Sequence, residues 1–158
     1  MKRRAIKDDL PFISKLIFDA AKNNHFSREL RSPIRWFFFK RNLNSMVIKD
    51  RDNGGFTTEV YIWEKLNLPI GFVILAWDPL GGWELRMAAI SSEYRGKGYG
   101  REMLDNFLSK FMKDKETLYA RCYWESKVML GYLKRRGFKQ LSADKTSTFL
   151  TNDYRYTY

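Results

Sequence analysis

A short segment in the second half of the chain combines three glycines with basic side chains. It reads Arg95-Gly96-Lys97-Gly98-Tyr99-Gly100-Arg101 and lies between a predicted strand and a predicted helix. Glycines let the backbone approach a ligand closely and expose consecutive N–H groups. The N-terminus of the following helix adds partial positive charge, and the arginines and the lysine add charge-assisted donors. The segment therefore predicts a phosphate or pyrophosphate site; the alternative is a tight turn that needs glycine only for its geometry.

Two common phosphate-binding motifs do not match this segment. A P-loop requires G-x-x-x-x-G-K followed by Ser or Thr, and the chain has no such string. The dinucleotide fingerprint G-x-G-x-x-G fails as well, because counting from Gly96 places Arg101 where the last glycine belongs. The phosphate ligand is therefore expected to be bound in some other way.

The turn is expected to be held by a strand before it and a helix after it. Residues 83–90 alternate, with Trp83 and Leu85 on one face and Glu84 and Ile90 on the other. The helix after the turn carries one apolar stripe. A strand at 117–124 follows, and then a helix with Ser126 as its N-cap and Gly137 at its end.

The rest of the chain supplies further helices and strands. Helices are expected after Pro11 and, in a short form, from Pro33. Strands are expected over 57–64, 70–77, 138–141 and 146–151. This order favours an α+β (α/β mixed sheet) fold, and residues 1–158 are read as one domain.

Composition limits the classes of protein to consider. At 44% hydrophobic and 16% aromatic residues the chain can bury a core. No stretch approaches the roughly 18 apolar residues of a membrane span, no secretion signal is read, and a lone Cys122 fits a reducing cytoplasm. With one histidine, His25, a zinc cage is not expected, so no metal is predicted. The net charge of +11 favours a polyanionic partner, nucleic acid included, or is merely a basic soluble surface.

The glycine-rich turn resembles the acetyl-CoA signature of the GNAT N-acetyltransferase superfamily. That signature is Gln or Arg, two residues, Gly, one residue, and Gly or Ala, here Arg95-x-x-Gly98-x-Gly100. The later helix ends as in the same family, with local similarity to coactivator-type histone acetyltransferases: Gly131-Tyr132-Leu133-Lys134-Arg135-Arg136-Gly137-Phe138.

The resemblance implies a fold and a coenzyme site. It implies about seven strands in a twisted, splayed mixed sheet flanked by about four helices. Acetyl-CoA, a cosubstrate, would lie between the fourth and fifth strands, along the backbone of Ala89, Ile90 and Ser91. Its pyrophosphate would sit on the turn, and Ser126 stands where many members have a coenzyme-binding asparagine. The residues implied for the turn are Arg95, Gly96, Lys97, Gly98, Tyr99, Gly100 and Arg101.

Acyl transfer to an amine also needs proton transfer. In coactivator-type relatives a glutamate at the position of Glu84 acts as base; here it is alternatively a solvated glutamate or one paired with Arg86. Glu59, Glu64 or a water chain are the other candidate bases. Many members place a tyrosine acid where this chain has Leu133; Tyr132 is the candidate nearby, although one residue rotates a helical side chain by ~100°.

The expected activity is acetyl-CoA-dependent N-acetylation of a primary amine by direct attack, on a protein lysine, a protein N-terminus or a small molecule. The alternatives are an amine carried by nucleic acid, such as aminoacyl-tRNA, and a non-catalytic scaffold that binds coenzyme A or nucleic acid. A monomer or homodimer without membrane association is expected. One of the aromatic residues 36–39 is a candidate wall of the acceptor groove, and residues 154–158 a candidate cover or dimer contact.

Overall fold

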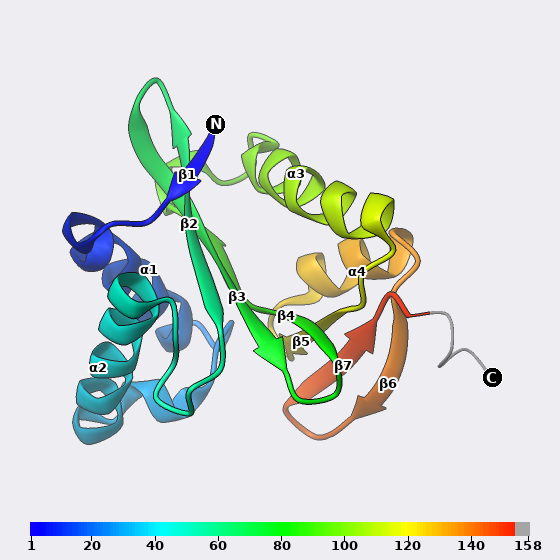
Figure 1. Ribbon diagram of the computed structural model, residues 1–158, viewed down its shortest axis with the longest axis horizontal. Coiled ribbons are helices and arrows are strands. Elements are labelled where there is room, and N and C mark those ends of the chain that lie inside the picture. The colour runs from blue at the N-terminus through cyan, green and yellow to red at the C-terminus, as the bar shows by residue number, and fades with distance from the viewer. Residues whose placement is uncertain (154–158) are drawn as a thin grey trace.

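Seven strands form one mixed sheet in the computed structural model, which describes residues 1–153 (Figure 1). Their order across the sheet is β1-β2-β3-β4-β5-β7-β6. The strands are β1 (Lys2–Arg4), β2 (Thr58–Lys65), β3 (Leu68–Asp78), β4 (Gly82–Ile90), β5 (Leu118–Tyr123), β6 (Lys139–Ala143) and β7 (Ser147–Thr151). The α-helices are α1 (Leu10–Lys22), α2 (Pro33–Lys49), α3 (Tyr99–Asp114) and α4 (Lys127–Arg135). This arrangement confirms the predicted fold.

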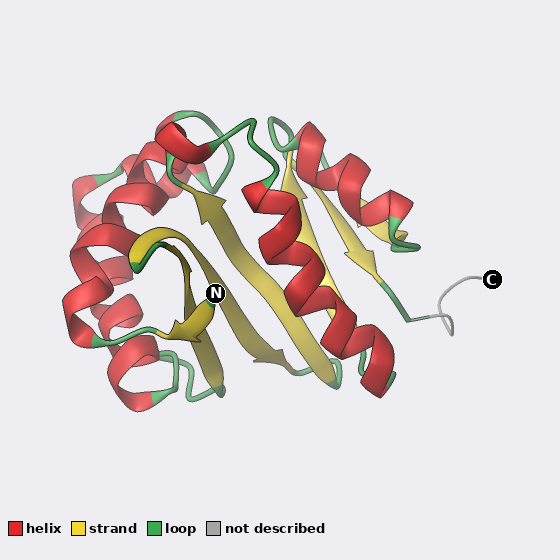
Figure 2. Ribbon diagram, turned by 90° about the horizontal axis from the view of Figure 1, so that it is seen from above, coloured by secondary structure: helices red, strands yellow, loops and turns green. Residues whose placement is uncertain are grey.

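The helices cover opposite faces of the sheet in pairs. Figure 2 shows α1 and α2 on one side of the central strands and α3 with α4 on the other. Strand β3 lies between the two layers, so its residues are buried from Ile70 to Ala76. Phe72 and Ile74 pack toward α1 and α2, whereas Val73 and Leu75 pack toward α3 and α4. A continuous apolar run is what a strand covered on both faces requires.

Strands β4 and β5 are parallel neighbours over a short distance only. The register pairs Trp83 to Leu85 with Leu118 to Ala120 and goes no further. At the point of contact the strands are very close, because a Cβ atom on Gly82 would lie 2.8 Å from the carbonyl oxygen of Thr117. Beyond Leu85 the two strands part, which leaves one edge of the second half of β4 without a strand partner among residues 1–153.

A β-bulge in β4 changes which side chains share a face. Ile74 pairs with Met87 and Leu75 with Leu85, so Arg86 is an extra residue in β4. The predicted strict alternation over 83–90 is therefore wrong beyond Leu85. Glu84 shares its face with Met87 and Ala89, which pack toward α1 and α2, and not with Ala88 and Ile90.

Other differences from the predicted elements lie mainly at their ends. Helix α2 runs for 17 residues where a short helix was expected, and the expected strands begin or end within a few residues of the observed ones. The strand β1 was not predicted; it adds to β2 at the edge of the sheet. No helix within residues 1–153 is long and apolar enough to cross a lipid bilayer.

Candidate active site

The glycine-rich turn joins the end of β4 to the start of α3 through a short 3-10 helix, Ser92–Tyr94. Gly96 and Gly98 have φ values of +73° and +85°, the left-handed region that glycine adopts without strain. A Cβ atom on either residue would meet nothing within 4 Å. The backbone conformation, and not crowding, therefore requires glycine here, and the space beside the turn is open.

The N-terminus of α3 is available to an anion. Its N-cap is Gly98, no side chain caps it, and the amide of Glu102 donates to the Gly98 carbonyl at 3.0 Å. The amides of Tyr99, Gly100 and Arg101 precede that bond, and they belong to the helix turn whose N–H groups lack intrahelical acceptors. A pyrophosphate group is the kind of ligand that such a helix end binds.

Two basic side chains of the turn hold its backbone in place. Arg95 Nε donates to the carbonyl of Ile90 at 2.9 Å, and Lys97 Nζ donates to the carbonyl of Glu93 at 3.0 Å. Both side chains thus have backbone acceptors in addition to the anion contacts predicted for them. Arg101, exposed in the first turn of α3, forms no hydrogen bond or ion pair among residues 1–153 and is a third basic group beside the helix end.

The open edge of β4 continues toward this turn. On its other edge β4 is bonded to β3, with Ala88, Ala89 and Ile90 opposite Val73, Phe72 and Gly71. The amide of Ser91 donates to the Ile70 carbonyl at 2.8 Å, which ends the ladder. Toward β5 the same residues have no strand partner in the described part of the chain, so backbone groups on this edge of β4 face the gap. An extended ligand can pair there as an added strand.

Glu84 lies where β4 and β5 part, and it belongs to a chain of charged groups. Its Oε2 accepts from Arg86 Nε at 3.3 Å, and Arg86 Nη1 donates to Asp52 Oδ2 at 2.9 Å. Burial raises the pKa of Asp52, but hydrogen bonds from Arg86 and backbone amides outweigh it and hold that pKa below its usual range. Arg86, positioned by the bulge, is thus fixed between two carboxylates.

Tyr123 of β5 lies within the electrostatic influence of Glu84, although the residue opposite Glu84 in the β4–β5 register is Tyr119; Tyr123 was not among the residues selected from the sequence. It alternates with Cys122, which is in the core under α3 and α4, so the tyrosine lies on the other face. Burial first, and then the negative charge of Glu84, raise the pKa of Tyr123 against the opposing effect of Arg121. Strand alternation from Cys122 was the available signal for the face of Tyr123; that Tyr123 lies near enough to Glu84 for this electrostatic effect depends on the parallel pairing of β4 and β5.

The other candidate bases are not brought to the gap. Glu59 accepts a hydrogen bond from the Tyr61 hydroxyl at 2.8 Å, and Glu64 accepts from Arg3 Nε at 2.6 Å. Both lie on β2, which β3 separates from β4. Of the three glutamates proposed from the sequence, Glu84 is the one beside the parting strands.

Tyr132 points between the two helices of its layer. Its hydroxyl donates to the carboxylate of Asp105 on α3, which also pairs with Arg136. Burial, followed by the bond to Asp105, raises the pKa of Tyr132 well above its usual range. Its neighbour Leu133 is fully buried in the core. The tyrosine therefore ties α4 to α3 in this structure.

Ser126 is at the predicted N-cap of α4 but does not cap the helix with its side chain, so that part of the prediction is wrong. Its Oγ lies 3.2 Å from His25 Nδ1 and donates to the His25 carbonyl at 3.3 Å. Through these two contacts with His25, the serine links the start of α4 to the loop after α1.

The environment of Cys122 makes it a poor nucleophile. Cys122 is 3% exposed, and burial raises the pKa of its thiol to about 12. Such a thiol is inert at neutral pH. Residues 1–153 contain no group of three or more His, Cys, Asp or Glu side chains placed to hold a metal ion.

The parted strands, the uncapped helix end and the glycine turn together form a site whose shape and donors fit an extended ligand with a phosphate group. Residues 15–138 match the acetyltransferase (GNAT) family. The chain belongs to that family, which makes it an acetyltransferase and confirms the resemblance seen in the sequence. A comparison with curated proteins gives no match.

Solved structures show the same fold at low identity. The PaiA N-acetyltransferase of Thermoplasma acidophilum, in complex with coenzyme A, has a TM-score of 0.75 at 16% identity, over 98% of both chains. A ribosomal-protein-alanine N-acetyltransferase of Brucella melitensis has a TM-score of 0.65 at 19% identity, over 96% of this chain and 98% of that one. A "histone acetyltransferase HPA2 and related acetyltransferase" of Corynebacterium glutamicum has a TM-score of 0.68 at 19% identity, over 96% and 94%.

Proposed function

We propose that this protein transfers the acetyl group of acetyl-CoA to a primary amine by direct attack of the amine. The observation that carries the proposal is the continuity between the unpaired edge of β4 and the uncapped N-terminus of α3. An extended arm fits along the first and a pyrophosphate fits on the second. A molecule that combines both parts is coenzyme A.

The backbone groups of Ala89, Ile90 and Ser91 would bind the pantetheine arm. The turn from Arg95 to Arg101 would bind the pyrophosphate, with its open left-handed glycines giving the ligand access to the amides. Acetyl-CoA supplies the acetyl group as an activated thioester. The backbone amide near Ile90 then polarises the thioester carbonyl by hydrogen bonding, as a preformed donor does for a developing oxyanion.

Glu84 is the proposed base. A lysine-like amine has a reference pKa of about 10.4 and must lose a proton before it attacks. The carboxylate of Glu84 lies at the parting of the strands, is 19% exposed, and is oriented by Arg86. It would accept that proton directly or through one water. Because the Tyr132 hydroxyl donates a hydrogen bond to Asp105, we propose that Tyr132 joins α4 to α3 and does not act as the catalytic acid.

The acceptor that we favour is an amine of a protein. Two of the structures with the same fold carry protein acceptors in their names, a ribosomal protein and a histone. The second candidate is an amine attached to nucleic acid, which the net charge of +11 favours. The lone, buried Cys122 is consistent with our further proposal that the protein works in a reducing cytoplasm.

A mass-spectrometric screen tests the proposal. The protein is incubated with acetyl-CoA and, in separate reactions, basic peptides, polyamines, aminoglycosides and aminoacyl-tRNA, and each acceptor is examined for an added acetyl group. Acetylation of a peptide amine supports the first acceptor class, and acetylation of aminoacyl-tRNA the second. Binding of acetyl-CoA in calorimetry without turnover on any acceptor would contradict the enzymatic proposal and support a non-catalytic scaffold.

A further inference from the structure

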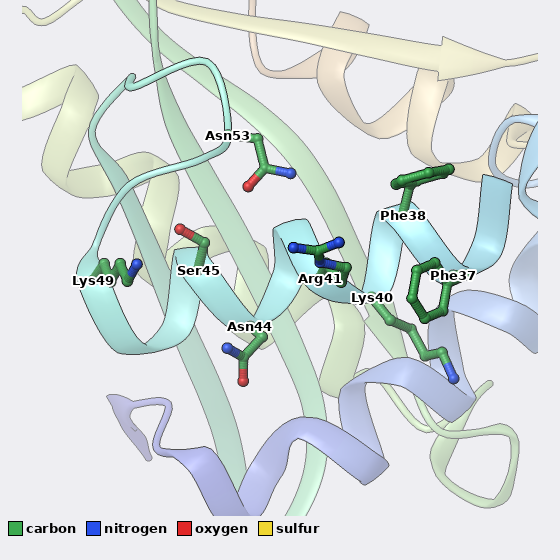
Figure 3. A pocket seen from close by; sticks show the side chains of 8 residues that line it. All are labelled: Phe37, Phe38, Lys40, Arg41, Asn44, Ser45, Lys49 and Asn53. Atoms are coloured by element: carbon green, nitrogen blue, oxygen red, sulfur yellow. The ribbon is translucent and has the colours of Figure 1, made fainter. Parts of the chain in front are cut away.

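A groove runs along the outer side of α2, away from the sheet. Its volume is about 710 Å³, and Figure 3 shows aromatic side chains at one end and Lys49 at the other. The lining residues are Phe37, Phe38, Lys40, Arg41, Asn44, Ser45, Lys49 and Asn53. The proposed acetyl transfer uses none of them.

Two phenylalanines of the groove are exposed although the same helix has an apolar face on the core. Trp36 and Phe39 stack on each other and are partly buried against the core between α1, α2 and the sheet, on the same side as the buried Leu43 and Met46. Phe37 and Phe38 are 55% and 57% exposed and meet edge to face, with ring centroids 5.6 Å apart. These two rings offer flat apolar surface to solvent, which the core does not explain.

The remaining charge of the groove is entirely positive. Lys40, Arg41 and Lys49 have no carboxylate within ion-pair distance among residues 1–153, and α2 contains no Asp or Glu. The two aspartates just after the helix are already paired: Asp50 with Arg4, and Asp52 with Arg86. The groove therefore attracts anions and has no built-in counter-charge.

We propose that the α2 groove binds single-stranded nucleic acid. Proteins that bind such strands combine basic groups along the phosphates with aromatic rings on which bases stack. Here bases would stack on Phe37 and Phe38. The phosphates would form ion pairs with Lys40, Arg41 and Lys49. A second copy of the chain fits less well, because a symmetric contact would set the same positive surface against itself. An acidic peptide would use the charges but not the exposed rings.

Two consecutive residues, Asp52 and Asn53, link the candidate active site to the edge of the groove. Asn53, at its edge, follows Asp52, which holds Arg86 beside Glu84. Any influence of a bound strand on Glu84 through Asp52 and Arg86 rests on the proposed function. Binding itself does not, because it requires neither acetyl-CoA nor turnover.

The test measures fluorescence anisotropy of a labelled single-stranded RNA of about ten nucleotides, within the usual site size of such proteins. Phe37→Ala/Phe38→Ala should weaken binding tenfold or more, since stacked bases contribute about that much or more each. Phe37→Leu/Phe38→Leu keeps apolar surface and should weaken binding as much. Lys40→Gln/Lys49→Gln should make the negative slope of log K against log salt shallower by about 1.4, that is, by about 0.7 for each lost phosphate contact.

The matched control is Lys110→Gln/Lys113→Gln, which removes the same charge from exposed sites on α3, on the other side of the molecule (Figure 1). It should bind RNA like the unmodified protein. Equal weakening by the control, full binding by the leucine variant, or poly-glutamate binding with the same sensitivity would each overturn the proposal. A groove-dependent dimer seen by light scattering without RNA would also overturn it. Melting curves show that each variant is folded.

Discussion

Gly71 of β3 lies against Ile90 at the end of β4 so closely that no side chain fits between them. A Cβ atom at Gly71 would stand 2.5 Å from Ile90 Cδ1 and 2.8 Å from the Ala89 carbonyl oxygen. The absence of a side chain at Gly71 therefore allows the end of β4 to lie this close to β3. Since the proposed coenzyme arm lies along that end, a glycine in the core positions the site without touching the ligand.

Gly71→Ala should displace the end of β4. We expect a loss of about 1–3 kcal/mol in the free energy of unfolding, as for other overpacked cores, and a raised KM for acetyl-CoA. Urea denaturation and steady-state kinetics measure the two. Gly131→Ala is the control: in helix α4 its Cβ would meet only the flexible end of Arg135, and it should be neutral or stabilising. An unchanged KM in a destabilised Gly71 variant would contradict the positioning role.

Gly98→Ala should weaken coenzyme A binding. Its φ of +85° strains an alanine by about 1–2 kcal/mol, and relief of that strain would move the amides at the start of α3. Gly81→Ala introduces the same strain at a φ of +88°, also with nothing within 4 Å of the Cβ, in the turn before β4. Calorimetry should show reduced affinity for the first variant alone. Equal affinity of both variants would mean that the turn does not bind the coenzyme.

Glu84→Gln should lower kcat by about 10²–10⁴, the usual contribution of a general base, and leave coenzyme A affinity nearly unchanged. The amide keeps the size of the side chain but cannot take up the proton. Glu59→Gln, on β2, should retain kcat because that carboxylate is away from the gap. A Glu84 variant that loses kcat and coenzyme affinity together would indicate a structural role.

Tyr132→Phe distinguishes a structural tyrosine from an acid. Removal of the hydroxyl deletes its hydrogen bond to Asp105, so unfolding should become easier by about 1–2 kcal/mol. We expect kcat to stay within about twofold, because the hydroxyl is engaged between α3 and α4. A fall in kcat of tenfold or more at unchanged stability would restore Tyr132 as the acid toward the leaving thiolate.

The free energy of unfolding should fall in acid because the carboxylate of Asp9 becomes protonated. Burial raises the pKa of this carboxyl, but hydrogen bonds from Arg3 and from the Ile6 amide outweigh burial and hold the pKa below its ordinary 3.8. A carboxyl group whose pKa is lower in the folded state stabilises the protein at pH values above its pKa in the unfolded state, which is about 4. That stabilisation is lost as the pH falls below this unfolded-state pKa toward the folded-state pKa.

Asp9→Asn should therefore lower the free energy of unfolding by about 2 kcal/mol at pH 7, with a smaller difference from the unmodified protein near pH 2–3. Urea denaturation at both pH values measures this. Asp114→Asn, at an exposed position at the end of α3, is the control and should change little. A difference that stays the same at low pH would show that the ion pair with Arg3 is not its source.

Local features of the chain could be predicted because neighbouring residues produce them. The glycine-rich turn, the apolar stripe of α3 and the helix end at Gly137 each depend on a few consecutive residues, and all three are present. The chemistry of the turn also follows from residue types alone. Glu84 could be selected through the resemblance to coactivator-type relatives, which have a glutamate base at its position in the strand before the turn.

The tertiary structure decided which of these groups meet. The bulge at Arg86 arises from pairing between β3 and β4, and it reverses the face on which Glu84 was expected. Tyr123 comes within the electrostatic influence of Glu84 because β5 lies parallel to β4. The exposure of Phe37 and Phe38 depends on how α2 packs. Each of these features is set by contacts between segments that are distant in the sequence. The energies of such contacts cannot be derived from the order of residues within one segment.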